Sequence, residues 1–167
     1  MSPFDGSFLI RPYAPADLPA LQAVRAAAFA PVFASFRNIV GPEIAALGLT
    51  TAEQEQADLL NSIAKPASGH SIAVAESGGV VAGFVSWKTD IAPGIGEITL
   101  NGVHPDHGGK GIGTALYDHA LAALKSAGML LATVGTGGDP SHAPARRAYE
   151  KVGFNVHLPS IYMYRKL

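Results

Sequence analysis

Four glycines, Gly108, Gly109, Gly111 and Gly113, fall within a short stretch around Lys110. An apolar-striped segment follows directly, so the pattern predicts a glycine-rich loop that opens a helix. The first amides of a helix have no partner within it and carry the positive end of its dipole. Because glycine lets the backbone approach a ligand closely, such a loop is typical of a phosphate-binding site.

Two common phosphate-binding loops do not match this spacing. The nucleotide P-loop requires Gly, four residues and then Gly-Lys-Ser/Thr, but here Lys110 is followed by Gly111 and the first glycine position holds His104. The dinucleotide fingerprint Gly-x-Gly-x-x-Gly would end at Thr114 or at Leu116, depending on which glycine begins it. The loop therefore has to be compared with other phosphate sites.

The segments around the loop indicate a mixed α/β fold built on one sheet. Strand-like runs cover residues 7–13, 71–77, 80–87, 96–103, 129–136, 154–157 and 160–166, and the run 129–136 has the apolar character of a buried strand. Helical spacing of apolar residues covers 17–36, 43–48, 50–67, 114–128 and 143–153. No repeat or linker is visible, which predicts a single domain over residues 1–167.

Some local features of these elements can also be predicted. Pro31 should break or kink the first helix, and Asp17 could cap its start. Thr50 or Thr51 could cap the helix predicted within residues 50–67. The glycine pair at 78–79 separates two strands and predicts a hairpin.

The glycine loop resembles the acyl-CoA loop of the GCN5-related N-acetyltransferases, the GNAT family. That motif is Arg/Gln-x-x-Gly-x-Gly/Ala, and it follows a strand that ends in Val-x-Pro. In the segment VHPDHGGKGIGTAL, Gly111 and Gly113 match the motif glycines, and Val103 and Pro105 match the approach to them. Gly108 stands where the family usually has Arg or Gln.

A second segment, HAPARRAYEKVGF, is similar to the family's Asn-x-x-Ala-x-x-x-Tyr-Glu-Lys-x-Gly-Phe motif. The matching residues are Ala145, Tyr149, Glu150, Lys151, Gly153 and Phe154, and His142 stands where the family often has Asn. Both motifs are in the family's order, with a helix and a strand between them. The resemblance covers nearly the whole chain and implies the GNAT acyl-CoA N-acyltransferase fold, a mostly antiparallel central sheet flanked by helices.

The resemblance also implies a cosubstrate, acetyl-CoA, and no metal. Its binding residues are then expected to be Val103, Gly108, Gly109, Lys110, Gly111, Ile112, Gly113, Thr114, His142 and Tyr149. Without the Arg or Gln side chain at position 108, the backbone amides of the loop remain to hold the pyrophosphate. At position 142, imidazole can still donate one hydrogen bond.

Acetyl transfer to an amine makes three demands on a site. The carbonyl oxygen must be stabilised as an oxyanion, the amine must lose its proton, and the thiolate can need an acid. The resemblance implies that the backbone N–H of Val103 stabilises the oxyanion and that Tyr149 is the acid for the thiolate. Glu97 is the only carboxylate in its predicted strand, and in this family such a position often carries the general base. The alternatives are an exposed ion-pair partner for Glu97 and a core position for the Tyr149 ring.

Other residues of chemical interest have plainer interpretations. His104 and His107 invite a metal site, but no third ligand has suitable spacing, so we expect solvated loop histidines. The phenylalanines at 29, 33 and 36 are expected in the core, although the first helices of this family also wall the acceptor site. Arg37 could meet an acidic substrate group or face water.

Composition limits the classes of function. The chain of 167 residues has 48% hydrophobic and 15% charged residues and a formal net charge of -1, which argues against nucleic-acid or anionic membrane partners. The absence of cysteine excludes thiolate catalysis and disulfides. The N-terminus lacks the pattern of a signal peptide, and no apolar run approaches membrane-spanning length, so we expect a cytoplasmic protein.

The sequence thus predicts an acyl-CoA-dependent N-acetyltransferase that uses direct attack in a ternary complex. The alternative is a non-catalytic CoA-binding or sensing module on the same fold. The acceptor is open: a polyamine, an amino acid, an aminoglycoside, a small toxic amine or a protein N-terminus would each fit, and a homodimer is possible.

Overall fold

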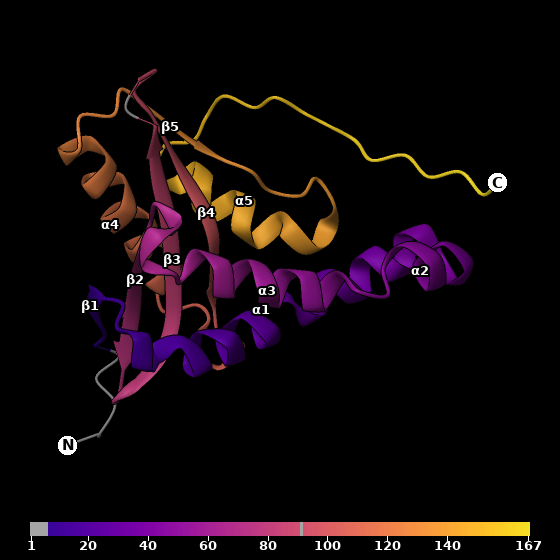
Figure 1. The fold of residues 1–167 in the computed structure, drawn as a ribbon, viewed down its shortest axis with the longest axis horizontal. Helices are drawn as coiled ribbons and strands as arrows, with labels where there is room; N and C mark the ends of the chain where they lie inside the picture. Colours follow the sequence, from indigo (N-terminus) through magenta and orange to yellow (C-terminus); the bar gives the residue numbers. More distant parts are fainter. Residues whose placement is uncertain (1–6, 91) are drawn as a thin grey trace.

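The computed structural model describes residues 7–90 and 92–167, and it has one five-stranded sheet with helices on both faces (Figure 1). The strands are β1 (Leu9–Pro12), β2 (His70–Ser77), β3 (Val80–Asp90), β4 (Ile95–Val103) and β5 (Leu131–Val134), and they lie in that order across the sheet. The first three pairs are antiparallel, whereas β4 and β5 are parallel. The predicted mixed α/β fold with a mostly antiparallel sheet is confirmed.

The helices are α1 (Leu18–Val40), α2 (Pro42–Gly48), α3 (Ala52–Ile63), α4 (Ile112–Ser126) and α5 (Ala143–Lys151). Short 3₁₀ turns are η1 (Pro15–Asp17), η2 (Pro66–Ser68), η3 (Pro105–His107) and η4 (Pro140–His142). One face of the sheet packs on α1 and α3 through a cluster of Leu21, Val24, Leu60, Val74 and Phe84. The other face packs on α4 and α5 through a cluster that includes Val85, Ile98, Leu116, Leu124 and Tyr149.

The predicted hairpin is present between β2 and β3. Ser77 pairs with Val80, and the two glycines between them have φ angles of 61° and 80°. Only glycine adopts such angles without strain, so the pair at 78–79 fixes the turn and with it the register of the two strands.

The sequence predicts a break or a kink at Pro31, and of these the break does not occur, because α1 continues through this residue. The residues that follow, Val32 and Phe33, are buried, and their packing holds the helix together where one backbone hydrogen bond is lost. The wall that α1 offers to the rest of the molecule is therefore one continuous element.

Neither predicted helix cap forms as expected. Asp17 precedes α1, but its carboxylate accepts two hydrogen bonds from Arg11 and one from the Ala14 N–H instead of capping the helix. Thr51 precedes α3, and its hydroxyl donates to Glu55. In both cases another side-chain hydrogen bond competes successfully with the cap.

Residues Pro15–Val40 are long and apolar enough to cross a membrane by length and composition alone, which corrects the expectation that no segment approaches that length. Four of its apolar side chains, Leu21, Val24, Val32 and Phe33, are buried within the protein. Packing against the sheet and α3 therefore accounts for Leu21 and Val24.

The C-terminal end of the chain differs from the prediction. The strands predicted over 154–157 and 160–166 are wrong, because residues 152–167 belong to no helix or strand. The segment instead runs away from the sheet towards α2 (Figure 1), where Lys166 forms an ion pair with Glu43 at 2.6 Å. Strand β5 also differs from the buried strand that was predicted, since Leu131 is 55% exposed.

Strand β4 contains a β-bulge. Val85 pairs with Asn101 but Trp87 pairs with Ile98, so two residues of β4 lie opposite Ser86 alone. Ser86 is fully buried, and its hydroxyl bonds both the Thr99 hydroxyl at 2.7 Å and the Leu100 carbonyl at 2.6 Å. The bulge is thus held by hydrogen bonds from the neighbouring strand.

The extra residue changes which side chains face α4. Before the bulge, Gly96 and Ile98 point to that face; after it, Asn101 and Val103 do. Glu97, before the bulge, is therefore on the face of α1 and α3. One strand consequently supplies polar side chains to both sides of the sheet.

Strands β4 and β5 separate part of the way along their length. Their pairing runs from Ile95 opposite Leu131 to Ile98 opposite Val134, and there β5 ends while β4 continues to Val103. The sheet is open beyond this point, and the site described below lies there.

Candidate active site

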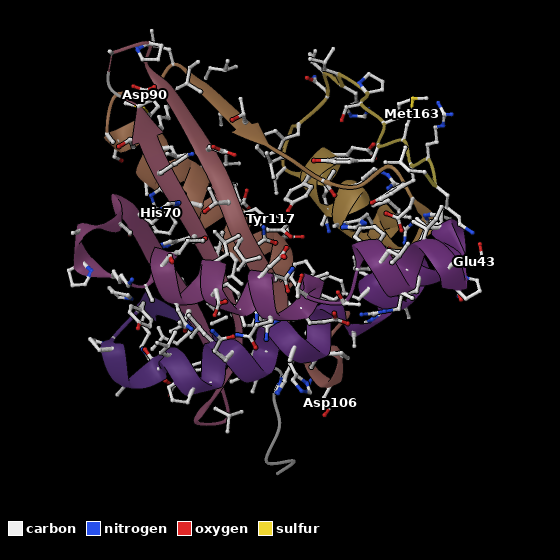
Figure 2. The ribbon with its side chains drawn as sticks, turned by 45° about the vertical axis from the view of Figure 1, so that its right-hand side comes forward. Glu43, His70, Asp90, Asp106, Tyr117 and Met163 are labelled. Carbon is white, nitrogen blue, oxygen red and sulfur yellow. The ribbon has the colours of Figure 1, made fainter. Side chains whose placement is uncertain are left out.

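A cleft of about 1100 Å³ lies where β4 continues beyond β5. The glycine loop and the start of α4 form one end, and η4 and α5 form the other. The second half of β4 forms the floor, and α1 contributes a wall that includes Phe29, Pro31 and Val32. Figure 2 shows the side chain of Tyr117, which also lines this cleft, near the centre of the molecule.

The loop end of the cleft presents free backbone amides. Helix α4 begins at Ile112, and the N–H of Ala115 makes the first helical hydrogen bond, to the Gly111 carbonyl at 3.0 Å. The amides of Ile112, Gly113 and Thr114 therefore have no acceptor within the helix, and no side chain caps it. Gly111 reaches this geometry with a φ of 79°, which a residue with a side chain rarely adopts.

Two residues predicted to bind the cofactor have restricted roles. The N–H of Gly108 already donates to the Pro105 carbonyl at 3.0 Å, so this amide is not available to a phosphate. Its φ of -62° suits any residue, and a Cβ would lie 3.1 Å from the Pro105 carbonyl oxygen. The side chain of Lys110 is exposed and does not line the cleft.

His107 is not the solvated loop residue that the sequence predicts. Its Nδ1 atom is buried without a hydrogen-bond partner, and the residue lines the cleft beside Gly108 and Gly109. His104 is partly exposed, and its Nδ1 accepts from the Asp106 N–H at 3.3 Å. Over residues 7–90 and 92–167, no three His, Asp or Glu side chains gather as a metal site would require.

The backbone of β4 offers a donor at the floor of the cleft. The N–H of His104 donates to the Ala82 carbonyl at 2.8 Å, and N–H directions alternate along an antiparallel strand. The N–H of Val103 therefore points away from β3, towards the side where β5 has ended. Val103 lines the cleft, so this geometry suits the oxyanion role predicted for it.

A polar network lies between β4, α4 and α5. The hydroxyl of Tyr117 donates to Asn101 Oδ1 at 2.9 Å, and Asn101 Nδ2 donates to the Tyr149 hydroxyl oxygen at 2.9 Å. The two tyrosine rings are 4.6 Å apart between centroids, and Tyr149 is only 6% exposed. Sequence reasoning found Tyr149 but missed Asn101 and Tyr117, because the bulge that turns Asn101 towards them has no signature in the sequence.

Both tyrosines retain their protons at neutral pH. Burial raises the pKa of Tyr149, and the hydrogen bonds with Asn101 and Tyr117 offset only part of that effect. Burial also raises the pKa of Tyr117 well above its usual range, and the nearby Tyr149 adds to it. A buried phenol that keeps its proton can donate it to a developing anion.

Glu97 lines the cleft from the face of α1 and α3. Its carboxylate lies 3.0 Å from Lys88 Nζ, its cross-strand neighbour, and its side chain is 40% exposed. The ion-pair alternative considered for Glu97 is therefore present, while the base role stays a prediction.

At the other end of the cleft, His142 is held by Asp139. Their Nδ1 and Oδ1 atoms are 2.5 Å apart, and both side chains are largely buried. The ring of His142 stacks on Phe36 of α1 with centroids 5.7 Å apart. Sequence reasoning missed Asp139, although an Asp before Pro that accepts the Ser141 N–H is a common way to begin a short helical turn.

The remaining residues of α1 differ in part from expectation. Phe33 is buried as predicted, whereas Phe29 and Phe36 are only partly buried. Arg37 binds the Glu53 carboxylate and the Leu49 carbonyl, so its charge is already balanced within the protein. An acidic substrate group would have to displace Glu53 from it.

Comparison with known proteins connects this geometry to one family. Residues 36–154 match the model of the Acetyltransferase (GNAT) family. A mycothiol acetyltransferase from Streptomyces avermitilis is 35% identical over 92 residues, which cover 55% of this chain and 29% of that protein. The match thus spans less than a third of the length of this relative.

Solved structures share the fold. The PaiA N-acetyltransferase from Thermoplasma acidophilum, in complex with coenzyme A, has a TM-score of 0.68 at 22% identity and covers 90% of this chain and 91% of its own. The ribosomal-protein-S18-alanine N-acetyltransferase from Escherichia coli has a TM-score of 0.66 at 19% identity and covers 91% and 80%. At such identities the likeness concerns the fold alone.

Proposed function

The chain belongs to the GNAT acetyltransferase family, and on that premise we propose that it transfers an acetyl group from acetyl-CoA to the amine of an acceptor. The observation that carries the proposal is the conjunction, in one cleft, of a free helix N-terminus, a strand amide without a neighbour and a buried protonated tyrosine. Each of these serves a different part of acetyl transfer.

The cofactor is bound at the loop end. The amides of Ile112, Gly113 and Thr114 receive the pyrophosphate, and the helix dipole favours its negative charge. His107 Nδ1, which is buried and unpartnered beside the loop, can add a hydrogen bond. The opening between β4 and β5 then admits the pantetheine arm and brings the thioester to the centre of the cleft.

The chemical step follows from the groups around that centre. The acceptor nitrogen attacks the carbonyl carbon, and the oxygen that gains negative charge receives the Val103 N–H. The C–S bond breaks, and Tyr149 gives its proton to the departing sulfur or hydrogen-bonds it. Before the attack, a group in the cleft must take the ammonium proton, and the Glu97 carboxylate is the one predicted from the sequence.

The wall of the cleft built by α1 selects the acceptor amine. This wall carries Phe29, Pro31 and Val32, and it is apolar apart from the η4 side. An amine attached to a partly apolar body fits such a wall, and small-molecule amines and protein N-termini both remain within that class.

The test is to measure thiol release from acetyl-CoA with purified protein and four amines: spermidine, kanamycin, L-lysine and a peptide with N-terminal alanine. Acetyl-CoA binding is measured separately by calorimetry. Release that depends on one of these amines supports the proposal. If the protein binds acetyl-CoA but releases no thiol with all four amines, the result contradicts the proposal and favours the non-catalytic CoA-binding module.

A further inference from the structure

We propose that Asp139 and His142 form the proton-accepting pair of this site, with His142 as the catalytic base towards the acceptor amine and Asp139 as its positioning residue. The inference rests on the proposed function, since it assigns one step of that reaction. It moves the base role from Glu97, which the sequence makes the first choice, to His142, which the sequence places among the cofactor residues and names as a base only after Glu97.

The first argument is the tautomer of the ring. Asp139 accepts hydrogen bonds from the Ser35 hydroxyl at 3.0 Å, from the Ser141 N–H at 3.1 Å and from the Ser141 hydroxyl, besides that from His142. Burial alone would raise the pKa of Asp139, but these hydrogen bonds outweigh it and hold the pKa well below its usual range. An ionised carboxylate only accepts, so His142 Nδ1 must carry the hydrogen that faces it.

The second argument concerns the free nitrogen. With the hydrogen on Nδ1, the neutral ring has its lone pair on Nε2, which is the arrangement that lets a histidine accept a proton. Within residues 7–90 and 92–167, no hydrogen bond to this Nε2 is present. His142 lines the cleft and Asp139 does not, so the carboxylate lies behind the ring as a positioning group should.

The third argument is the place of the ring in the cleft. His142 stacks on Phe36, and Asp139 is hydrogen-bonded to Ser35, so the pair is attached to α1 on the acceptor wall. Glu97 differs, because its carboxylate is held by Lys88 and is more exposed. The Glu97 carboxylate is thus engaged by the Lys88 ammonium, whereas His142 Nε2 has no hydrogen-bond partner among residues 7–90 and 92–167.

Few charges act on the pair from neighbouring elements. Arg146 of α5 donates to the backbone carbonyls of Gly137 and Asp139 rather than to the carboxylate. On α1 the facing groups, Phe36 and Ser35, are neutral. The other titratable groups that line the cleft are His70, Lys88, Glu97, His107, Tyr117, Tyr149 and Lys151.

The proton balance is complete without another reactant. His142 Nε2 takes one proton from the acceptor ammonium, and the neutral amine forms the N–C bond. The tetrahedral intermediate loses a second proton from its nitrogen, the C–S bond breaks, and that proton ends on the sulfur by way of Tyr149. The imidazolium then releases the first proton to water, so the products are the amide, CoA thiol and one proton.

The main experiment compares the pH dependence of kcat in His142→Asn and Glu97→Gln. The acceptor is the peptide with N-terminal alanine if the wild type acetylates it. Otherwise it is the one of the other three amines that the wild type acetylates. Asn keeps a donor for Asp139 but has no nitrogen that titrates. We expect His142→Asn to lower kcat by ~100-fold or more below the pKa of the acceptor amine, which is ~7.8 for the peptide, and to recover above it. Acetyl-CoA affinity should stay within about threefold, and any loss of kcat in Glu97→Gln should persist above the acceptor pKa, unlike that of His142→Asn.

Glycines beside the pair supply a matched control. A Cβ on Gly137 would lie 2.6 Å from Asp139 Oδ1 and 2.7 Å from His142 Cε1, whereas one on Gly138 would meet nothing within 4 Å. Gly137→Ala should therefore displace the pair and reproduce part of the pH-dependent loss, about tenfold, while Gly138→Ala stays within about twofold. Asp139→Asn should move the acidic limb of the rate profile to lower pH, because the imidazolium loses its counter-charge.

Several results would overturn the assignment. A uniform loss in His142→Asn at every pH, together with weaker acetyl-CoA binding, would make the ring a cofactor ligand. A strong loss in Glu97→Gln that recovers above the acceptor pKa would return the base to Glu97. A wild-type protein that binds acetyl-CoA and acetylates none of the amines refutes the proposed function instead. Nitrogen-15 NMR of the wild type tests the pair independently of turnover, since a neutral His142 with its hydrogen on Nε2 is incompatible with it.

Discussion

The two ends of the cleft are built from different chemical groups. At the loop end, the ligand meets backbone amides at the start of α4, and the glycines matter because they have no side chain. At the η4 end, the chemistry depends on side chains that hold one another: Asp139 with His142, and Asn101 with two tyrosines. A backbone site leaves a pattern of glycines in the sequence, whereas a side-chain site is assembled from positions far apart in it.

The largest effect should come from giving the backbone end a side chain. Gly111→Val must adopt a φ near 79°, which a β-branched residue resists, and the change disturbs the start of α4. We expect acetyl-CoA binding to become undetectable by calorimetry, and the stabilisation by acetyl-CoA in thermal unfolding to vanish with it. Gly128→Ala, also at a positive φ but beyond the other end of α4, is the control for a general loss of stability. If Gly111→Val binds acetyl-CoA like the wild type, the loop is not the phosphate site.

At the side-chain end, the corresponding change should alter turnover and leave binding intact. Tyr149→Phe keeps the ring, its contact with Tyr117 and its burial, and removes the hydroxyl that is hydrogen-bonded to Asn101. We expect kcat to fall at least ~10-fold, with the acetyl-CoA dissociation constant within a few-fold. The loss should persist at high pH, unlike that of His142→Asn. Full activity of Tyr149→Phe across the pH range would contradict its role as the acid.

The side-chain end should also make folding stability depend on pH. The pKa of Asp139 is lowered in the folded protein, against ~3.9 for an unfolded aspartate, so its stabilisation is present above that value and is lost as pH falls towards the folded pKa. We expect the free energy of unfolding to be lower in Asp139→Asn by ~1.5–3 kcal/mol at pH 7, and this difference to shrink below about pH 4. Urea unfolding of both proteins at pH 7 and pH 3 measures it. A difference that is the same at both pH values would show that the carboxylate charge is not what stabilises the fold.

The smallest effect is expected from a substitution at Gly108, at the loop end of the cleft, where the backbone conformation already suits a residue with a side chain. Gly108 has a φ of -62° and its N–H is engaged, so Gly108→Arg needs only a slight shift near the Pro105 carbonyl. We expect acetyl-CoA affinity to be unchanged or improved, by up to about tenfold if the guanidinium reaches a phosphate. Titration at two salt concentrations separates that contact from a conformational effect. A large loss of affinity would mean that the space above Gly108 is part of the site.

The difference between a site made of backbone amides and a site made of side chains also explains how much of the structure could be predicted from the sequence. The hairpin, β4, α4 and α5 follow from periodicity, and the loop geometry follows from Gly109 and Gly111. Asn101 could not be predicted, because it acts through Tyr149, which is 48 residues away. Asp139 has a local signal as the start of a short helical turn, but its contact with Ser35 of α1 appears only in the folded protein. The break at Pro31 does not occur because packing of Val32 and Phe33 outweighs the local preference. The two C-terminal strands are absent because residues 154–166 leave the sheet and pair with neither of its edges. Glu97, Tyr149 and the cofactor residues stay predictions until their variants are assayed.

The bulge in β4 decides where along the strand a change of length can be tolerated. A substitution at Thr99 or Leu100 exchanges one side chain, and its neighbours keep their orientation. Deleting either residue would leave one residue opposite Ser86 and restore simple alternation, so Asn101 would stay opposite Val85 and keep facing the tyrosines. Such a deletion would remove one of the two hydrogen bonds of the buried Ser86 hydroxyl and leave the rest of the strand in place. Deleting Gly102, which lies outside the bulge, would instead turn Val103 and its amide to the other face of the sheet. Loss of one residue is therefore expected to be far less damaging at 99–100 than at 102.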